Sequence, residues 1–282
     1  MMKTVQNRRY GHIKDAPGKL RRMFALAPSY RTYPPVFSHR GSPHLCEVYN
    51  QLQHGSCVLN TTLTVFDFQH HLLTEEFADL SRMFAYRQVM CAEGTDPATD
   101  GGCMPADAYQ FLMQSGSCAE RLWPYTADNS GLVNTPPAEC FADALTNQAL
   151  QDRSVPLDLP TIKSVLVNQP ITIGITVFDG DNGLESETAA KTGIVGLPSS
   201  YNQLRPLGGH GVTLMGWDDA KLIPRPVKGI KWPWTKVQNT VGAVEIRNSW
   251  GIWGDAGNFW LPYEFLLNPD WCDSLWTFDK VE

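Results

Sequence analysis

Two cysteines of this chain follow the same dipeptide, and only one stands where a thiol becomes a nucleophile. The tripeptide Gly-Ser-Cys ends once at Cys57 and once at Cys118. A thiol attacks as the thiolate, so it needs a lowered pKa, which a helix N-terminus and a neighbouring imidazolium can supply. Gly55 and Ser56 place Cys57 at the predicted start of a helix, with the Ser56 hydroxyl as an N-cap. Cys118 follows the end of a predicted helix, where the dipole has the wrong sign, so the pattern favours Cys57.

A base and a residue that orients it are predicted far along the chain. His210, in "PLGGHGVTLMGW", follows two glycines that permit close backbone approach, and it opens a predicted strand. His70 and His71 lie inside a predicted helix, where a solvated or core role is the simpler reading. In "EIRNSWGIWGD", Asn248 could orient an imidazole through its side-chain carbonyl while Trp250 shields that bond from water. Taken singly, these segments are equally compatible with a surface histidine and an aromatic-rich turn.

The elements of the first half are predicted to be helices. Leu59, Leu63 and Phe66 recur at spacings of four and three, which places them on one face of a helix that begins at the candidate nucleophile. Residues 105–115 open with proline, carry apolar side chains along one side and end at Gly116, so they predict a second helix.

The second half is predicted to be rich in strands. Pro160 stands near the start of a short helix, and the alternation of apolar residues through "ITIGITVF" predicts a half-buried strand. Further strands are predicted at residues 211–217, 242–248 and 257–262. Helices followed by strands indicate an α+β fold, in which two lobes of different texture leave a cleft where sites tend to form.

Composition excludes several classes of protein. The 282 residues are 43% hydrophobic and 18% charged, enough for one large globular domain or two lobes. A net charge of −6 without any Lys/Arg-rich run argues against binding nucleic acid or an acidic membrane surface. No apolar run approaches a membrane span, and the start lacks the apolar core of a signal peptide, so we expect a soluble chain whose compartment stays open. The seven cysteines include no C-x-x-C pair, which gives little support to a zinc site.

Together, three segments resemble the motifs of the papain-like cysteine peptidase family, in particular its microbial and viral members. "NQLQHGSC" is similar to the nucleophile motif, with a glutamine six residues before the cysteine, "GGHGVTLMGWDD" to the histidine motif, and "RNSWGIWGDAGNFWLPYEF" to the asparagine motif. The similarity spans about residues 34–279. It implies a two-lobed papain-like fold, with a helical lobe over about 34–158, a β-barrel-like lobe over about 159–282, and the active site in the cleft between them.

The resemblance also implies a role for each candidate residue. Cys57 would be the nucleophile, with His210 as its ion-pair partner and the acid for the leaving amine. Asn248 would orient His210, and Trp250 would cover the bond between them. Gln51 would donate its side-chain amide to the oxyanion, beside the backbone N–H of the nucleophile.

Substrate-binding positions follow less closely. Gly101 and Gly102 resemble the glycine pair that bonds an extended substrate backbone, and Gly209 joins them as a substrate-binding candidate. The cysteine usual three residues before the nucleophile is His54 here, so the disulfide it would make is absent, and Val58 replaces the usual aromatic. These departures affect substrate preference and disulfide pattern, not the reacting groups.

The expected function is hydrolysis of peptide bonds through a thioester acyl-enzyme on Cys57, with a peptide or protein as substrate and with no metal or organic cofactor. Two alternatives stay open. The same site could transfer the acyl group to an amine or cleave a non-peptide amide. The fold could also serve as a catalytically silent binding or structural protein. The natural substrate, endo- or exopeptidase action, and the oligomeric state stay open as well.

Residues 1–33 form an N-terminal extension, because "YPPVFSHR" at residues 33–40 resembles the start of a mature enzyme. The extension is too short for the helical prosegment usual in the family. Its aromatic and apolar residues could pack against the body either as a compact plug along the cleft or as a permanent brace away from it. A disordered tail is the third possibility. The absence of a long helix favours the brace slightly.

Overall fold

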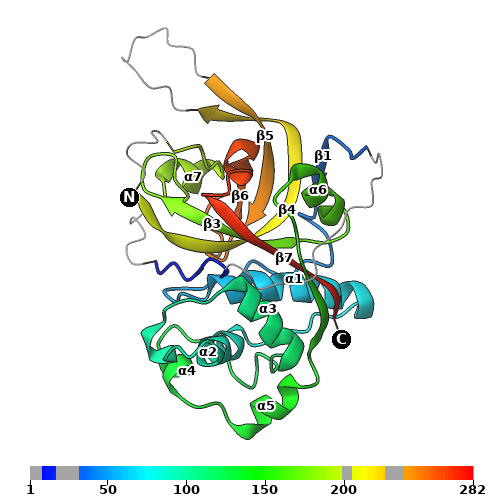
Figure 1. Ribbon diagram of the computed structural model, residues 1–282, viewed down its shortest axis with the longest axis vertical. Helices are drawn as coiled ribbons and strands as arrows, with labels where there is room; N and C mark the ends of the chain where they lie inside the picture. Colours follow the sequence, from blue (N-terminus) through cyan, green and yellow to red (C-terminus); the bar gives the residue numbers. More distant parts are fainter. Residues whose placement is uncertain (1–7, 17–31, 199–204, 226–237, 282) are drawn as a thin grey trace.

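A helical lobe and a strand-rich lobe make up the computed structural model of the chain (Figure 1), which describes residues 8–16, 32–198, 205–225 and 238–281. The helices are α1 (Cys57–Thr74), α2 (Arg82–Ala92), the short 3-10 helix η1 (Pro97–Thr99), α3 (Pro105–Gln114), α4 (Ser130–Val133), α5 (Ala138–Ala144), α6 (Leu159–Leu166), α7 (Glu187–Thr192) and α8 (Tyr263–Leu266). The strands are β1 (Val36–Ser38), β2 (Ala149–Ser154), β3 (Ile171–Phe178), β4 (Pro206–Arg225), β5 (Gln238–Arg247), β6 (Asn258–Pro262) and β7 (Cys272–Val281). No helix in these ranges is long and apolar enough to cross a membrane.

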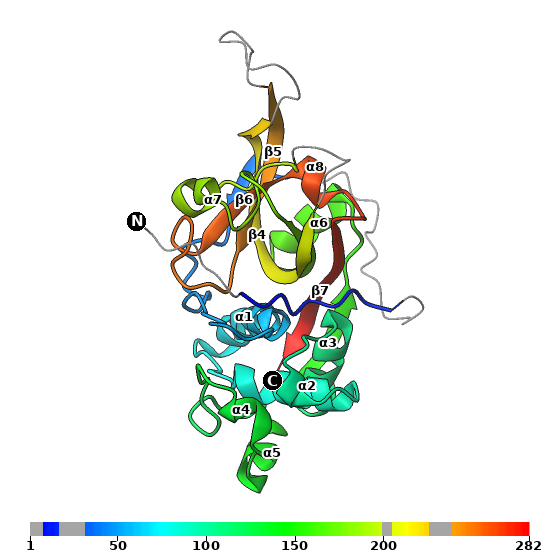
Figure 2. The ribbon, with the colours of Figure 1, turned by 90° about the vertical axis from the view of Figure 1, so that its left-hand side faces the viewer.

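The central helix α1 confirms the predicted helix and separates the two lobes (Figure 2). Its residues from Cys57 to Gln69 are buried, because the helix packs on the helical lobe and on the strands above it. The predicted cap is wrong in one detail: Ser56 precedes the helix, but its hydroxyl makes no capping bond. That hydroxyl instead contacts Tyr125 Oη at 2.5 Å and accepts from Asn60 Nδ2 at 3.0 Å. Ser56 therefore ties the start of α1 to the helical lobe.

The strands form one antiparallel sheet in the order β2-β7-β3-β4-β5-β6, and β1 pairs with β4. This path is open, so the expectation of a β-barrel-like lobe holds only for the curvature of the strands and not for closure. The outer edge of β6 is partly covered, because Ile194 forms a bridge with Trp260. The result is an α+β arrangement of a helical lobe and a strand-rich lobe.

Strand β3 is buried on both faces, although the alternation predicted a half-buried strand. The polar face was expected to meet water, but α1 packs on this strand, and Tyr109 of α3 reaches it. Thr172 is fully buried there and accepts a hydrogen bond from Tyr109 Oη at 2.8 Å. A buried hydroxyl with a partner is tolerated inside a core, so the alternation correctly marked a strand but not its exposure.

The two lobes are interlocked at both ends of the peptidase region. Val36–Ser38 pairs with β4, so this early segment belongs to the strand-rich lobe. In β7, Trp276 and Phe278 pack into the core of the helical lobe. A division of the chain near residue 158 therefore separates helix-rich from strand-rich sequence. In the fold, each lobe contains a strand from the other side of that boundary.

Candidate active site

The start of α1 meets the middle of β4 at a glycine, and this contact brings the candidate nucleophile to its base. A Cβ on Gly211 would lie only 3.1 Å from Val58 Cα, so only a bare backbone lets the helix approach this closely. Thr61 and Thr213 join the same two elements through a 2.6 Å hydrogen bond between their hydroxyls. Cys57 at the helix start and His210, the residue before Gly211, are both fully buried at this junction.

The imidazole of His210 is held from one side only. Its Nε2 lies 2.7 Å from Asn248 Oδ1, an atom that also accepts the backbone N–H of Ser249 at 2.8 Å. Because an amide oxygen only accepts, Nε2 carries the proton in this pair. The indole of Trp250 stacks on the imidazole with ring centroids 4.8 Å apart. The other ring nitrogen, Nδ1, has no hydrogen-bond partner among the described residues and is available to exchange a proton.

The amide of Gln51 is oriented by the residue that follows Asn248. Ser249 Oγ donates to Gln51 Oε1 at 2.6 Å, and the backbone N–H of Gln51 donates to Ser249 O at 2.8 Å. These bonds fix which end of the amide is the donor. Gln51 Nε2 is therefore the donor. It donates to the carbonyl oxygen of His54 in its own turn at 2.8 Å and to that of Arg9 in the extension at 3.3 Å.

Residues 8–16 of the N-terminal extension run between the two lobes beside α1 (Figure 2). The backbone of Gly11 to Ile13 is bonded to both walls. On the helical side, Cys103 N donates to Gly11 O at 2.8 Å, and Ile13 N donates to Cys103 O at 3.1 Å. On the strand side, His12 N donates to Gly209 O at 3.0 Å. The segment is thus held as an extra extended strand between the lobes.

Side chains of the extension also cover the catalytic group. The guanidinium of Arg8 lies 3.7 Å from the centroid of the Trp250 ring, a cation–π contact. Tyr10 meets His210 edge-on, with ring centroids 6.2 Å apart. Residues 8–16, the part of the extension that the structure describes, therefore lie in the cleft. A brace was expected to pack away from it.

Comparison with known proteins places this arrangement in a family. The model of the papain family of cysteine proteases matches residues 33–265. The chain belongs to the papain family of cysteine proteases. A peptidase C1-like protein of Acanthamoeba polyphaga mimivirus is 26% identical over 80% of this chain and 68% of its own length. A probable cysteine protease of Arabidopsis thaliana is 27% identical over 80% of this chain and 56% of its own length.

Solved structures agree on the fold. Xylellain, a cysteine protease from Xylella fastidiosa, superposes with a TM-score of 0.79 at 25% identity and covers 98% of this chain and 97% of its own. Procathepsin B of Trypanosoma congolense superposes with a TM-score of 0.70 at 15% identity, covering 98% of this chain and 87% of its own. As a member of this family, the chain is a cysteine protease, a hydrolase that acts on peptide or protein substrates.

In this papain-family protease, burial favours the neutral forms of the two candidate catalytic residues. Burial raises the pKa of the Cys57 thiol, although the backbone groups of Gly211 and Gly11 act to lower it. Burial lowers the pKa of His210 to about 3, against the opposing effect of its hydrogen bond to Asn248. The dipole of α1 favours a thiolate at Cys57, but a charge pair needs solvation that the covered cleft does not offer. With the extension in the cleft, Cys57 therefore stays a protonated thiol and His210 a neutral imidazole.

The candidate substrate-binding glycines take different places. A Cβ on Gly102 would lie 2.1 Å from Gly11 O, so this glycine touches the backbone in the cleft. Gly209 accepts a hydrogen bond from that backbone. Gly101 lies nearest to Thr99 and Thr95 instead. On the helical wall the hydrogen bonds come from Cys103, one residue beyond the predicted pair.

A buried ion pair occupies the position of the missing disulfide. His54 Nδ1 lies 3.6 Å from Asp100 Oδ2, and both side chains are only 2% exposed. Asp100 Oδ1 also accepts from the backbone N–H of Gly55 at 2.9 Å and from Tyr86 Oη at 2.8 Å. Burial opposes the charged form of His54, yet the nearby Asp100 carboxylate and the Thr126 carbonyl, 3.0 Å from His54 Nε2, raise the pKa of His54 above the ordinary value. This network fixes the turn before the nucleophile.

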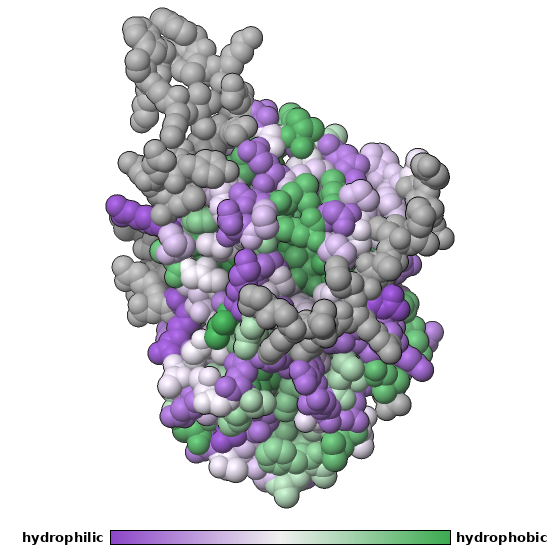
Figure 3. Space-filling view, in the orientation of Figure 1, coloured by the Kyte–Doolittle hydropathy of each residue, from purple (hydrophilic) through white to green (hydrophobic). Residues whose placement is uncertain are grey.

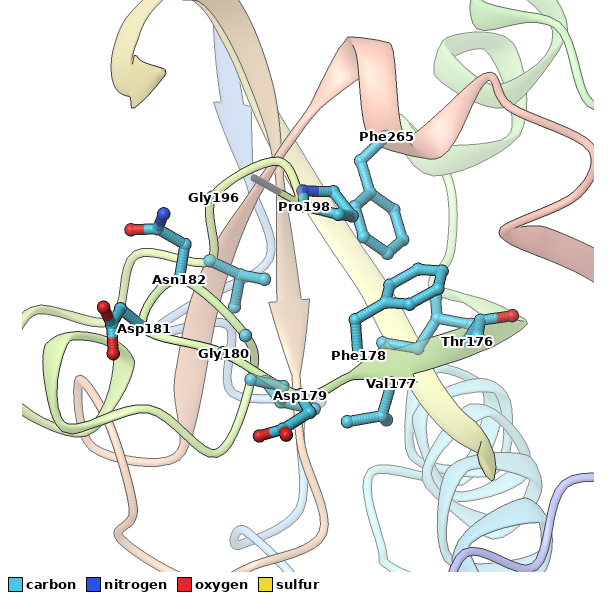
Figure 4. Close-up of a pocket in the computed structure, with 14 residues that line it drawn as sticks. Thr176, Val177, Phe178, Asp179, Gly180, Asp181, Asn182, Gly196, Pro198 and Phe265 are labelled. Atoms are coloured by element: carbon cyan, nitrogen blue, oxygen red, sulfur yellow. The ribbon is translucent and has the colours of Figure 1, made fainter. Parts of the chain in front are cut away.

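A pocket in the strand-rich lobe lies apart from this site (Figure 4). Phe178, Pro198 and Phe265 form an apolar wall, while the carboxylates of Asp179 and Asp181 point away from it. On the face seen in Figure 3, apolar residues gather over this half of the molecule. The two phenylalanines belong to the core of the lobe, and no candidate catalytic residue lines the pocket. We therefore interpret it as a gap beside the core.

Four residues that shape the cleft were missed in the sequence: Asp100, Cys103, Ser249 and Asp273. Ser249 follows Asn248 directly. A hydroxyl beside the amide that orients the imidazole was therefore the sequence feature that could have identified it. The others act through partners distant in the chain. Asp273, for example, lies opposite Gly174 in the pairing of β7 with β3, and no local pattern marks it.

Proposed function

We propose that this protease hydrolyses peptide bonds with Cys57 as nucleophile, His210 as acid and base, Asn248 as the residue that orients the imidazole, and Gln51 as an oxyanion donor. One observation carries the proposal. The His210 ring is fixed through Nε2 by Asn248, which leaves Nδ1 without a described partner, and Cys57 begins an 18-residue helix that packs on Gly211, the residue after His210.

The reaction follows from these groups. With substrate in place of the extension, the proton of Cys57 passes to His210 Nδ1, and the thiolate attacks the carbonyl carbon. The carbonyl oxygen becomes negative and accepts hydrogen bonds from Gln51 Nε2 and the backbone N–H of Cys57. His210 then gives its proton to the amine nitrogen as the C–N bond breaks. Water, deprotonated by His210, attacks the thioester, the C–S bond breaks, and the acid product leaves.

We propose further that residues 8–15 hold the site closed as a non-productive occupant. Gln51 Nε2 holds the carbonyl of Arg9, whereas the backbone of Gly11 lies close enough to the Cys57 thiol to act on its pKa. The oxyanion donor and the nucleophile thus face different peptide groups among residues 8–16. The segment also pairs parallel to the helical wall at Cys103. It occupies the place of a substrate without presenting a bond for attack.

Gly11 offers a way to open the cleft while keeping the whole chain. A Cβ on Gly11 would lie 1.5 Å from the carbonyl oxygen of Gly55, so Gly11→Ala cannot keep the segment in its place. Ile13→Ala is the matched control, because the Ile13 side chain is 44% exposed and its backbone bonds do not depend on it. We expect Gly11→Ala to raise turnover of peptides at least tenfold, and Ile13→Ala to leave it near that of the wild type.

The peptidase itself is tested by digesting a peptide library with four full-length chains: wild type, Gly11→Ala, and each with Cys57→Ala. Cleavage that disappears with Cys57→Ala supports the proposed mechanism. Amide products formed with an added amine would instead support acyl transfer, and no reaction in any chain would support a silent protein. If Gly11→Ala lowers the melting temperature and leaves turnover unchanged, the segment is a brace.

A further inference from the structure

An open cavity in the helical lobe lies apart from the cleft. It has a volume of about 720 Å³, a size typical of cavities that bind small ligands. Its walls come from the segments on both sides of Gln51, from α1 and α2, and from the loops at residues 77–79 and 120–125. None of the candidate catalytic residues lines it, and neither do residues 8–16. The cavity is therefore separate from the proposed catalytic site.

Carboxylates dominate the charge of this cavity. Four acidic side chains line it, and Arg82 is the cation among its lining residues. One of the four, Glu120, lies within 3.6 Å of the Arg82 guanidinium. The other three, Glu47, Asp67 and Asp79, form no ion pair with any other residue that the structure describes. The cavity thus carries an excess of negative charge, which attracts cations.

Arg82 is part of the wall, because its guanidinium is already engaged. The guanidinium lies 4.3 Å from the centroid of the Tyr49 ring and 4.3 Å from that of the Tyr125 ring. Its Nη1 donates to Asn60 Oδ1 at 3.1 Å, and Glu120 balances its charge. These contacts hold Arg82 in place and leave the other three carboxylates without a counter-ion.

One of these carboxylates is buried and uses only one of its oxygens. Asp67 is 2% exposed, and its Oδ2 accepts a hydrogen bond from Tyr49 Oη at 2.5 Å. Its Oδ1 is buried and has no hydrogen-bond partner among the described residues. Burial raises the pKa of Asp67, against the opposing effects of the Tyr49 hydroxyl and the Ala78 backbone. A buried carboxylate without a counter-charge is costly, and a ligand's ammonium group would supply both a donor and a charge.

The remaining walls favour an organic cation over a metal ion. Phe77 and Leu52 line the same cavity and are 41% and 39% exposed, so they offer apolar surface to a ligand. In the part of the chain that the structure describes, no three His, Cys, Asp or Glu side chains lie where they could hold a metal ion together. A hard cation such as calcium needs six or more oxygen ligands, whereas an ammonium group can bind to a single carboxylate.

We propose that this cavity binds aliphatic diamines. One ammonium group donates to Asp67 Oδ1, the hydrocarbon chain packs on Phe77 and Leu52, and the second ammonium group lies near Glu47 and Asp79. Both of these outer carboxylates are exposed, so the second group keeps part of its water. Binding requires neither the proposed nucleophile nor an open cleft, and the inference therefore stands or falls independently of the peptidase mechanism.

Isothermal titration calorimetry of the full-length wild-type chain tests the ligand class. The three ligands, diaminopentane, aminopentanol and pentanediol, have the same chain length and differ in charge. The titrations are done at pH 8, above the pKa of about 6 that burial gives Asp67. We expect the diamine to bind about tenfold to a hundredfold more tightly than the diol, the range of a charge-assisted hydrogen bond. The amino alcohol should bind about twofold to fivefold more weakly than the diamine, because its hydroxyl loses only the exposed carboxylates.

Three substitutions identify the position of the ligand. Asp67→Asn should weaken binding of the diamine at least tenfold. Asp79→Asn should weaken it about twofold to fivefold, and asparagine tolerates the φ of 46° at this residue. Asp270→Asn removes the same charge from an exposed residue of the strand-rich lobe and should leave the affinity unchanged. Melting temperatures show whether each variant is folded.

Four results would overturn the inference. The first is that the diamine does not bind to the wild-type chain, and the second is that the diol binds as tightly as the diamine. The third is an equal loss of affinity with Asp67→Asn and Asp270→Asn, which would show attraction to the net charge of −6 alone. The fourth is that calcium chloride binds more tightly than the diamine and loses its affinity with Asp67→Asn, which would identify a metal site.

Discussion

The covered catalytic pair makes a kinetic prediction about the reactivity of Cys57. Cys57 and His210 are fully buried under the extension, where the neutral forms are favoured. In the wild-type chain, iodoacetamide should therefore label Cys57 only when the segment opens. In Gly11→Ala the clash with Gly55 keeps the cleft open, so Cys57 should label at the rate of an activated thiol.

The contacts of the segment set the size of this effect. Three backbone hydrogen bonds contribute about 1 kcal/mol each, and the charge-assisted bond between His12 and Asp273 about 2 kcal/mol. Opening regains water contacts and chain entropy, so the net preference for the closed form is smaller, about 2–4 kcal/mol. Since each 1.4 kcal/mol is a factor of ten, Gly11→Ala should accelerate labelling by about 30-fold to 1,000-fold.

The pH dependence tests the ion pair separately. Once solvent reaches the site, the dipole of α1 and the imidazolium of His210 both favour the thiolate. Cys57 in Gly11→Ala should then react at pH 5–6, far below the ordinary thiol pKa of about 8.5. His210→Ala in the same background should slow this reaction and shift its pH profile upward.

Mass spectrometry of the labelled peptides follows each cysteine in one experiment. Cys91 is the exposed cysteine of the chain and serves as the internal standard for an ordinary thiol. Equal rates for Cys57 in wild type and Gly11→Ala, relative to Cys91, would show that the segment does not protect the nucleophile. An unchanged pH profile after His210→Ala would refute the ion pair.

Two buried ionisable groups give further predictions, both checked by chemical denaturation at two pH values. The raised pKa of His54 means that its pairing with Asp100 stabilises the fold fully below about pH 6.5 and is lost as pH rises through the folded-state pKa. His54→Gln should thus lower the free energy of unfolding by about 1–3 kcal/mol more at pH 5.5 than at pH 8.5, and an equal loss at both would contradict this. Burial raises the pKa of Asp67 to about 6, so its ionisation removes stability as pH rises from about 4 to above 6. Asp67→Asn keeps an acceptor for the Tyr49 hydroxyl, now 2.5 Å from Asp67, and should raise the free energy of unfolding by about 2–3 kcal/mol at pH 8 but little at pH 4; no gain at pH 8 would refute the burial argument.

The candidate catalytic residues could be proposed from the sequence because short segments define them. Cys57 follows Gly-Ser at a helix start, and His210 follows a pair of glycines within β4. Asn248 lies in an aromatic turn that has few other uses for a buried amide. Each local feature survives in the fold because neighbouring glycines let backbone segments approach closely, so the spacing along the chain carries enough information.

The cleft walls could not be predicted in the same way, because long-range pairing defines them. Asp273 becomes a wall residue only through the register of β7 against β3, which places it opposite Gly174. The burial of Thr172 likewise depends on a hydroxyl from another element, Tyr109. A two-residue alternation identifies a strand but is silent on what packs against its second face. Strand register and the packing of each sheet face depend on the whole sheet. Local sequence patterns identify single strands and cannot predict either.

The path of the extension depends on the same kind of information. A long helix is unnecessary to close this cleft, because residues 11–13 already bond the backbone groups of Cys103 and Gly209 on its two walls. What distinguishes residues 8–15 from a substrate is register and not the nature of the contacts. The segment places Gly11 where a side chain would strike Gly55, and it offers a basic side chain to Asp273. Under the proposed mechanism a substrate presents one carbonyl to both Gln51 and Cys57, whereas in this segment Gln51 holds the carbonyl of Arg9 and the part nearest the Cys57 thiol is Gly11.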